Sequence, residues 1–210
     1  MTKRFALCIT CLAVLVSTCF LAVVSAEITV GVKQGDWIEY TVSISGEVPE
    51  LHDVSWCRFD ITAVDEKNVY VDITWRFVNG TEETESKTLK LETGQIGDCF
   101  IIPANLNHSG AFLSPEGYIM ISGVEEKTCA GATRTVVSAN TTETLFYWDR
   151  STGVLVEAKS TYPEFNMFTK VDKTNMWKPQ IFGLNPTVFL VLVVVLVAVL
   201  AVAIFLIRKR

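Results

Sequence analysis

Histidine is scarce in this 210-residue chain, which contains only His52 and His108. The sequence also lacks the G-x-S-x-G of serine hydrolases, a glycine-rich phosphate-binding loop and the H-E-x-x-H of zinc proteases. Two distant histidines and scattered cysteines do not have the spacing of a metal-ligand set. We therefore expect no catalytic, cofactor or metal site, and a protein that is not an enzyme.

The one conceivable catalytic pair is His52 with Asp53, in the loop "GEVPELHDVSW". Neighbours along a chain are not thereby aligned for proton transfer, so an exposed loop histidine is the simpler interpretation. Adjacent acidic residues such as Glu82 and Glu83 fall at an expected turn, where solvation accounts for them. A hydrolase acting on envelope polymers is therefore the third of the functions considered.

Polar side chains are also absent from a long stretch near the C-terminus. From Pro186 to Ile207, no residue after Thr187 is polar or charged. As a helix this stretch extends about 33 Å, and a bilayer's hydrocarbon core is about 30 Å thick. The basic residues 208–210 follow it, and basic residues beside a span favour the cytoplasmic side. The sequence predicts a transmembrane helix over 186–207 with a cytoplasmic tail at 208–210; lacking any ionisable group, it serves as an anchor in the lipid bilayer.

The N-terminus predicts export. Lys3 and Arg4 precede an apolar run, and "VSA" ends at Ala26, which predicts a signal peptide over 1–26. The run is long for a signal peptide, so an uncleaved first span stays open as the alternative. Both versions place residues 27–172 outside the cell, joined by a juxtamembrane linker at 173–185 to the span of a single-pass type I membrane protein.

The exported part is acidic, because residues 27–185 hold all 23 acidic side chains and only 13 of the 18 basic ones. This charge argues against nucleic acid as a partner. No repeat or internal linker divides 27–172, which we expect to be one extracellular domain. In the linker, Trp177 and Phe182 are placed to lie at the lipid headgroups.

Alternation with period two dominates this domain. In "GDWIEYTVSIS", the residues Ile38, Tyr40 and Val42 share one face, while Glu39 and Thr41 share the other. The stretches "VSWCRFDITAV" and "VYVDITWRFVNG" alternate in the same way, which predicts strands. Further strands are expected at Thr88–Glu92, Cys99–Ile102, Tyr118–Gly123, Thr128–Ser138, Thr144–Trp148, Val154–Thr161 and Met167–Val171, and a short helix within Pro103–Ser114 stays open. About ten strands in one sheet tend to curl, so we expect an all-β, mostly antiparallel meander forming a curved sheet or half-barrel.

Few cysteines remain after export, since Cys57, Cys99 and Cys129 are the three beyond the signal peptide. We favour a Cys99–Cys129 disulfide, because Cys57 is in phase with buried positions of its strand and suits a small buried hydrophobe. A bridge from Cys57 stays open as the alternative. Three sequons make Asn79, Asn107 and Asn140 candidates for N-glycosylation.

Tryptophan is more abundant than a minimal core requires, with Trp37, Trp56 and Trp148 predicted opposite the core face. A curled sheet offers a concave face that could bind an apolar ligand. The alternative is that these rings pack against loops.

Four stretches together resemble a group of archaeal exported surface proteins whose activity is uncharacterised: "GVKQGDWIEYTVS", "FIIPANLNHSG", "KTCAGATRTVV" and "YWDRSTGVLVEA". In that group a β-rich ectodomain precedes a C-terminal span. The resemblance implies compartment and architecture but no site. Cys129 departs from it, standing where an aromatic is expected, and a lineage-specific bridge to Cys99 would explain both. The D-x-x-T-G turn is similar to one in bacterial lipoprotein-carrier half-barrels, an analogy for lipid handling.

The first function expected is therefore a cell-surface structural or interaction module, with another envelope protein as its partner. The second is a membrane-tethered carrier or sensor of an apolar, lipid-like ligand. A filled interior favours the first, and a concave cavity lined by Trp and Phe favours the second.

Overall fold

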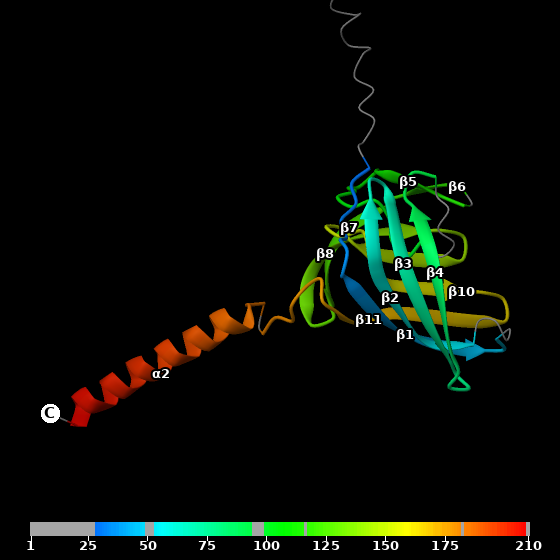
Figure 1. Ribbon diagram of the computed structural model, residues 1–210. Helices are drawn as coiled ribbons and strands as arrows, with labels where there is room; N and C mark the ends of the chain where they lie inside the picture. The colour runs from blue at the N-terminus through cyan, green and yellow to red at the C-terminus, as the bar shows by residue number, and fades with distance from the viewer. Residues whose placement is uncertain (1–27, 49–52, 94–98, 116, 182, 209–210) are drawn as a thin grey trace, which may run out of the picture.

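One antiparallel sheet forms most of the protein. The computed structural model describes residues 28–48, 53–93, 99–115, 117–181 and 183–208 (Figure 1). The sheet has nine strands in the order β4-β3-β2-β1-β11-β10-β9-β8-β7. Their bounds are β1 Trp37–Gly46, β2 Val54–Asp65, β3 Asn68–Phe77, β4 Glu82–Lys90, β7 Gly123–Cys129, β8 Ala132–Asn140, β9 Thr144–Asp149, β10 Leu155–Thr161 and β11 Phe165–Thr174. A separate hairpin joins β5 (Ala111–Ser114) to β6 (Gly117–Met120).

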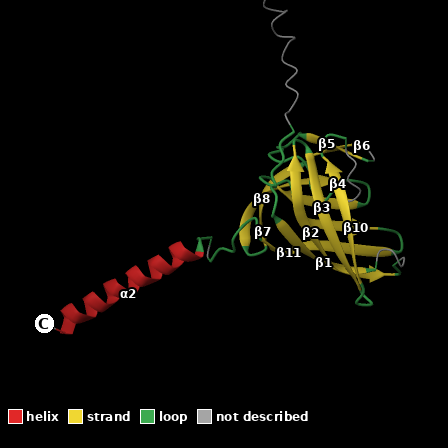
Figure 2. Cartoon of the chain, viewed as in Figure 1, coloured by secondary structure: helices red, strands yellow, loops and turns green. Residues whose placement is uncertain are grey.

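The sheet curls, so that β1–β4 lie on one side of the core and β7–β11 on the other (Figures 1 and 2). The first and last strands meet in the middle of the strand order, where Ile38 pairs with Thr174 and Gly46 with Phe165. The expected mostly antiparallel, curved β domain with one C-terminal helix is confirmed.

A segment without regular structure, Cys99–Ala104, lies inside the curve. The Leu155 amide donates to the carbonyl of Phe100, and the Ile102 amide donates to that of Gly153. On the other side, the Phe100 ring packs against the rings of Phe59 and Trp75. This segment therefore occupies part of the space between the two halves of the sheet.

Several expected elements differ from the observed ones. Thr128–Ser138 is not one strand: it contains the end of β7, a turn at Ala130 and Gly131, both with positive φ, and the start of β8. Cys99–Ile102 contributes only a single bridge, between Ile101 and Val154. The acidic strand β4 begins at Glu82, well before the predicted start. The sequence did not reveal this start, because β4 is an edge strand that is exposed almost throughout and has no alternation of apolar residues. Within Pro103–Ser114, the chain forms strand β5 rather than a helix.

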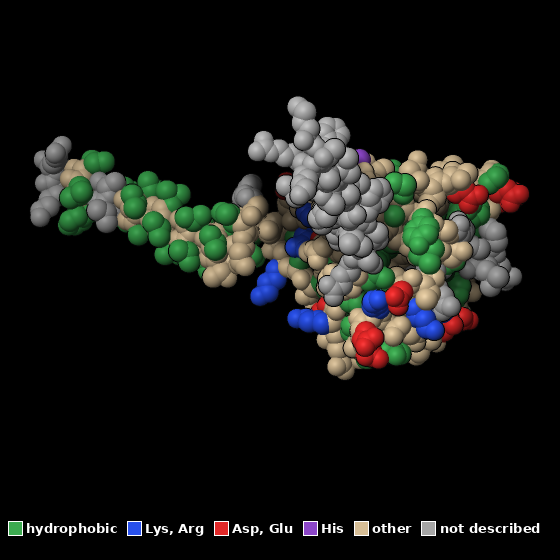
Figure 3. All heavy atoms as spheres, turned by 90° about the horizontal axis from the view of Figure 1, so that it is seen from above, with side chains coloured by type: hydrophobic (Ala, Val, Ile, Leu, Met, Phe, Trp, Pro, Cys, Tyr) green, Lys and Arg blue, Asp and Glu red, His purple; other side chains and the backbone are tan. Residues whose placement is uncertain are grey.

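Helix α2 (Pro186–Arg208) is long and apolar enough to cross a membrane. Hydrophobic side chains cover it along its length, whereas the β domain shows charges of both signs (Figure 3). The signal peptide predicted over 1–26 lies outside the described residues.

The segment that precedes helix α2, from Trp177 to Gln180, packs against the β domain. The Gln180 amide donates to the Gly131 carbonyl at 2.7 Å, and Gln180 Oε1 accepts from the Thr133 amide at 3.0 Å. Trp177 is 6% exposed and donates from Nε1 to the carbonyl of Cys129. The expectation that Trp177 lies at the lipid headgroups is therefore wrong, because the β7–β8 turn gives its ring a protein pocket and its N–H an acceptor. Phe182 lies outside the described residues.

Candidate functional site

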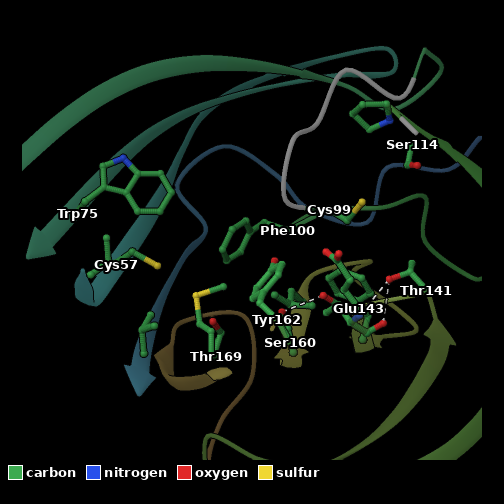
Figure 4. A pocket seen from close by; sticks show the side chains of 18 of the residues that line it. Cys57, Trp75, Cys99, Phe100, Ser114, Thr141, Glu143, Ser160, Tyr162 and Thr169 are labelled. Carbon is green, nitrogen blue, oxygen red and sulfur yellow. Dashed lines mark hydrogen bonds between the residues drawn. The ribbon is translucent and has the colours of Figure 1, made fainter. Parts of the chain in front are cut away.

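A cavity of about 740 Å³ lies between the two halves of the sheet (Figure 4). Its walls come from the C-terminal part of β1, the adjoining ends of β2, β3 and β4, the β8–β9 turn and the paired ends of β10 and β11. This is the Gly46–Phe165 end of the β1–β11 pair. Helix α2 follows from the opposite end of that pair, where Thr174 lies.

The inner wall is aromatic. Trp75, Phe77, Phe100 and Phe146 all line the cavity, with Met167 among the aliphatic neighbours. Phe100 is fixed by an edge contact to Tyr40 and a tilted contact to Phe59, with ring centroids 5.2 and 4.4 Å apart. These rings supply a preformed apolar surface, the property that ligand cavities in proteins share.

Hydroxyl groups also line the cavity. Thr141 comes from the β8–β9 turn, Thr144 from the start of β9, and Ser160 and Thr169 from β10 and β11. Thr144 Oγ1 donates to Ser160 Oγ at 2.8 Å, which fixes both side chains. The cavity is therefore amphipathic, lined by both aromatic rings and hydroxyl groups.

Small inward-facing residues leave this space empty. On β10, the buried Ala158 and Ser160 point inward, while Lys159 and Thr161 between and beyond them are exposed. Ser160 is paired with Met167 and Ala158 with Thr169 on the neighbouring strand. A larger residue at any of these positions would fill the cavity. Small and hydroxylated residues in the buried phase of a strand are the signal that the sequence carries, but they locate a cavity only once the strand pairing is known.

The tryptophans predicted to lie opposite the core face do not line the cavity. Trp37 and Trp56 lie under the guanidinium groups of Arg58 and Arg76, at 4.4 and 4.7 Å from the ring centroids. Trp148 is fully buried, stacks on Phe146 and donates to the carbonyl of Cys99 at 2.6 Å. Trp75, which the alternation placed on the core face, is the one that lines the cavity.

The predicted Cys99–Cys129 disulfide is not present in the structure, where both side chains are buried thiols. Cys99 and Cys129 lie near different parts of strand β8. Cys129 pairs with Ala132 at the start of β8, whereas Cys99 accepts a hydrogen bond from Trp148, which pairs with Val137 further along the strand. Burial, with a smaller contribution from the charge of Asp149, raises the pKa of Cys129 to about 11. Cys99 and Cys57 instead line the cavity.

The turn "DRSTG" between β9 and β10 is held by Asp149. This carboxylate is 1% exposed and accepts from Arg134 Nε at 2.7 Å, from the Ser151 hydroxyl and from the Thr152 amide. Burial alone would raise the pKa of Asp149, but the hydrogen bonds from Arg134, Ser151 and Thr152 outweigh it and hold that pKa below its ordinary value. Gly153 ends the turn with positive φ, and its missing Cβ leaves room for the carbonyl of Ile102. The turn therefore has a structural role.

The remaining predicted site residues are dispersed. Asn79, Asn107 and Asn140 are all exposed, at a turn, in a loop and at the end of β8, and their glycosylation stays a prediction. His52 lies outside the described residues. Across the ranges that the structure describes, no cluster of three or more His, Cys, Asp or Glu side chains is arranged to hold a metal ion.

No protein-family model matches this chain, and no curated protein matches it either. Among solved structures, a similar chain is that of the siderocalin Ex-FABP, described as functioning through dual ligand specificities. The two share 13% sequence identity with a TM-score of 0.26, over 70% of this chain and 76% of the other. A similarity at that score carries no weight for function.

Proposed function

We propose that this protein is a membrane-tethered carrier or sensor of an apolar, lipid-like ligand, held in the cavity of the curved sheet. The cavity carries the proposal, because its volume falls within the roughly 300–1,000 Å³ typical of small-molecule sites. Its aromatic wall offers apolar area, at about 25 cal/mol for each Å² removed from water. The structural or interaction module expected first from the sequence would have been favoured by a filled interior.

The position of the cavity fits a tethered binder. Its walls lie at the Gly46–Phe165 end of the sheet, while the chain leaves for the anchor from the Thr174 end. With the domain outside the cell, the cavity lies at the end of the sheet away from the anchor. A ligand held there is available to a partner or an acceptor in the envelope.

The test is native mass spectrometry of the protein purified from an exporting host, read for co-purifying lipid-like mass. In Ala158→Phe the new ring fills the cavity, and we expect ligand occupancy to fall about tenfold, equivalent to about 1.4 kcal/mol. Thr161→Phe places the same ring on the exposed face of the same strand and is the matched control. Equal occupancy in both variants, with both folded by circular dichroism, would place the ligand elsewhere and remove the proposal.

A further inference from the structure

Among the described residues, the side chains that line the cavity carry charge of one sign only. Glu83 from β4 and Glu143 from the β8–β9 turn are its charged side chains, and no lysine or arginine lines it among the described residues. The residues near it in sequence that lie outside the described part, 49–52, 94–98 and 116, include no lysine or arginine either. An anionic head group entering this cavity would meet two carboxylates and no counter-charge.

Several carboxylates of the sheet that are more deeply buried than these two have basic partners. Glu39 pairs with Arg58 at 2.8 Å, Asp149 with Arg134 at 2.7 Å, and Glu157 with Lys127 at 3.0 Å. No lysine or arginine pairs with Glu83 or Glu143 within the part of the chain that the structure describes. Basic residues thus neutralise these more buried carboxylates, whereas Glu83 and Glu143 have no such partner among the described residues. The exposed Glu125 and Glu126 of β7 have none either, so what distinguishes Glu83 and Glu143 is that they line the cavity.

The groups around Glu143 suit a cation. The Thr161 amide donates to the Glu143 carbonyl at 2.8 Å, which holds Glu143 at the end of β10, and Ser160, Tyr162 and Thr141 line the same cavity (Figure 4). Hydroxyl and carboxylate oxygens accept hydrogen bonds from an ammonium group, and aromatic faces attract cations through their quadrupole. The same rings that take an apolar chain therefore also favour a positive head.

We infer that the ligand is an amphiphile with a positively charged head group, its chain against the Trp75–Phe100 wall and its head beside Glu83 and Glu143. This inference rests on the proposed function and names the ligand class for the same cavity. Inward charges on an edge strand also discourage sheet-to-sheet association, which would explain Glu83 on β4. That explanation does not extend to Glu143, which lies in a turn on the other half of the sheet.

The experiment uses the full chain in nanodiscs of a zwitterionic lipid and three photoreactive probes. The probes share one diazirine-bearing alkyl chain and carry a quaternary ammonium, a neutral maltoside or a sulfate head. Labelled peptides are mapped by mass spectrometry, and labelling of the cavity residues is divided by labelling of α2. This ratio corrects for the different partitioning of each probe into the bilayer.

We expect the cavity-to-helix ratio to be highest for the ammonium probe and lowest for the sulfate, with about fivefold between them at low salt, since exposed charges interact modestly. Raising the salt concentration should reduce the difference between the ammonium and sulfate ratios, because salt screens the charges. The double variant Glu83→Gln, Glu143→Gln should give equal ratios for the ammonium and sulfate probes, while the ratio for the maltoside probe stays unchanged. Glu125→Gln with Glu126→Gln, on the exposed face and edge of β7, is the control and should preserve the difference.

The outcomes separate the inference from the proposed function. A sulfate ratio equal to or above the ammonium ratio would overturn the cationic head group while leaving an apolar-ligand binder intact. An order that survives the double Glu83 and Glu143 change would also overturn it. Labelling confined to α2 for all three probes would overturn the proposed function itself.

Discussion

Asp149 shows how one buried carboxylate can hold both a turn and a strand pair. Its oxygens accept from Arg134 on β8 and from Ser151 and Thr152 in the turn, so it joins β8 to the β9–β10 connection. Removing one partner of a buried ion pair is costly, because the remaining charge loses the group that compensates its desolvation.

We predict that Asp149→Asn lowers the free energy of unfolding by about 2 kcal/mol at pH 7, since Arg134 is partly exposed and recovers some hydration. The folded-state pKa of Asp149 is below its ordinary value, so its contribution is complete above about pH 4 and is lost as the pH falls further. Urea unfolding of both proteins from pH 7 to pH 3 should therefore show their difference shrinking below pH 4.

The control for this prediction is Asp172→Asn, a change of the same chemistry at an exposed position paired only at 3.5 Å with Lys173. Its effect should stay within about 0.5 kcal/mol. A difference between wild type and Asp149→Asn that stayed constant to pH 3 would show that the charge of Asp149 is not what stabilises the turn.

At the scale of elements, the alternation in the sequence was enough to predict strands whose two faces differ in environment. It was correct for β1, β2 and β3, whose buried residues fall at alternate positions: Ile38 and Tyr40 in β1, Cys57, Phe59 and Ile61 in β2, and Val69, Val71 and Ile73 in β3. The alternation failed for β4, which has almost no buried face. It also failed for the β7–β8 turn, where Ala130 has a positive φ that is unusual for alanine and could not be predicted from the residue type. The alternation could not identify the cavity. A small inward residue such as Ala158 or Ser160 indicates empty space only when the residues that face it are known.

The location predicted for Trp177 was wrong for a related reason. A tryptophan shortly before an apolar span suits the lipid interface, and only tertiary structure shows that Arg134 and the carbonyl of Cys129 are within its reach. Because Gln180 and Pro179 also contact the β7–β8 turn, the segment before the helix is a docked element and not a free tether.

We predict that Trp177→Ala destabilises the domain by about 3 kcal/mol, as truncation of a buried tryptophan does, and releases this segment. Hydrogen exchange measured by mass spectrometry should show faster exchange at Gln180, whose amide donates to Gly131, and at Thr133. Trp56→Ala, a half-buried ring on the outer face, is the matched control and should leave exchange at Gln180 unchanged. Unchanged protection in Trp177→Ala would mean that the backbone hydrogen bonds alone dock the segment.

At the scale of the molecule, the distribution of charge favours one orientation in the membrane. Helix α2 ends in basic residues, whereas residues 27–185 hold all 23 acidic side chains of the chain. Lysine and arginine within a few residues of a span set its orientation, and acidic residues contribute little. The basic tail should therefore stay in the cytoplasm, with the β domain and its cavity outside.

Cysteine labelling tests this orientation, because the three cysteines of the domain are buried and give little background. We predict that a membrane-impermeant maleimide labels Glu126→Cys, at the exposed edge strand β7, in intact cells. A cysteine added after Arg210 should be labelled only once the membrane is permeabilised. If the added cysteine reacted in intact cells and Glu126→Cys did not, the domain would lie in the cytoplasm. The cavity could then bind only an intracellular ligand, and none of the three sequons would meet the glycosylation machinery.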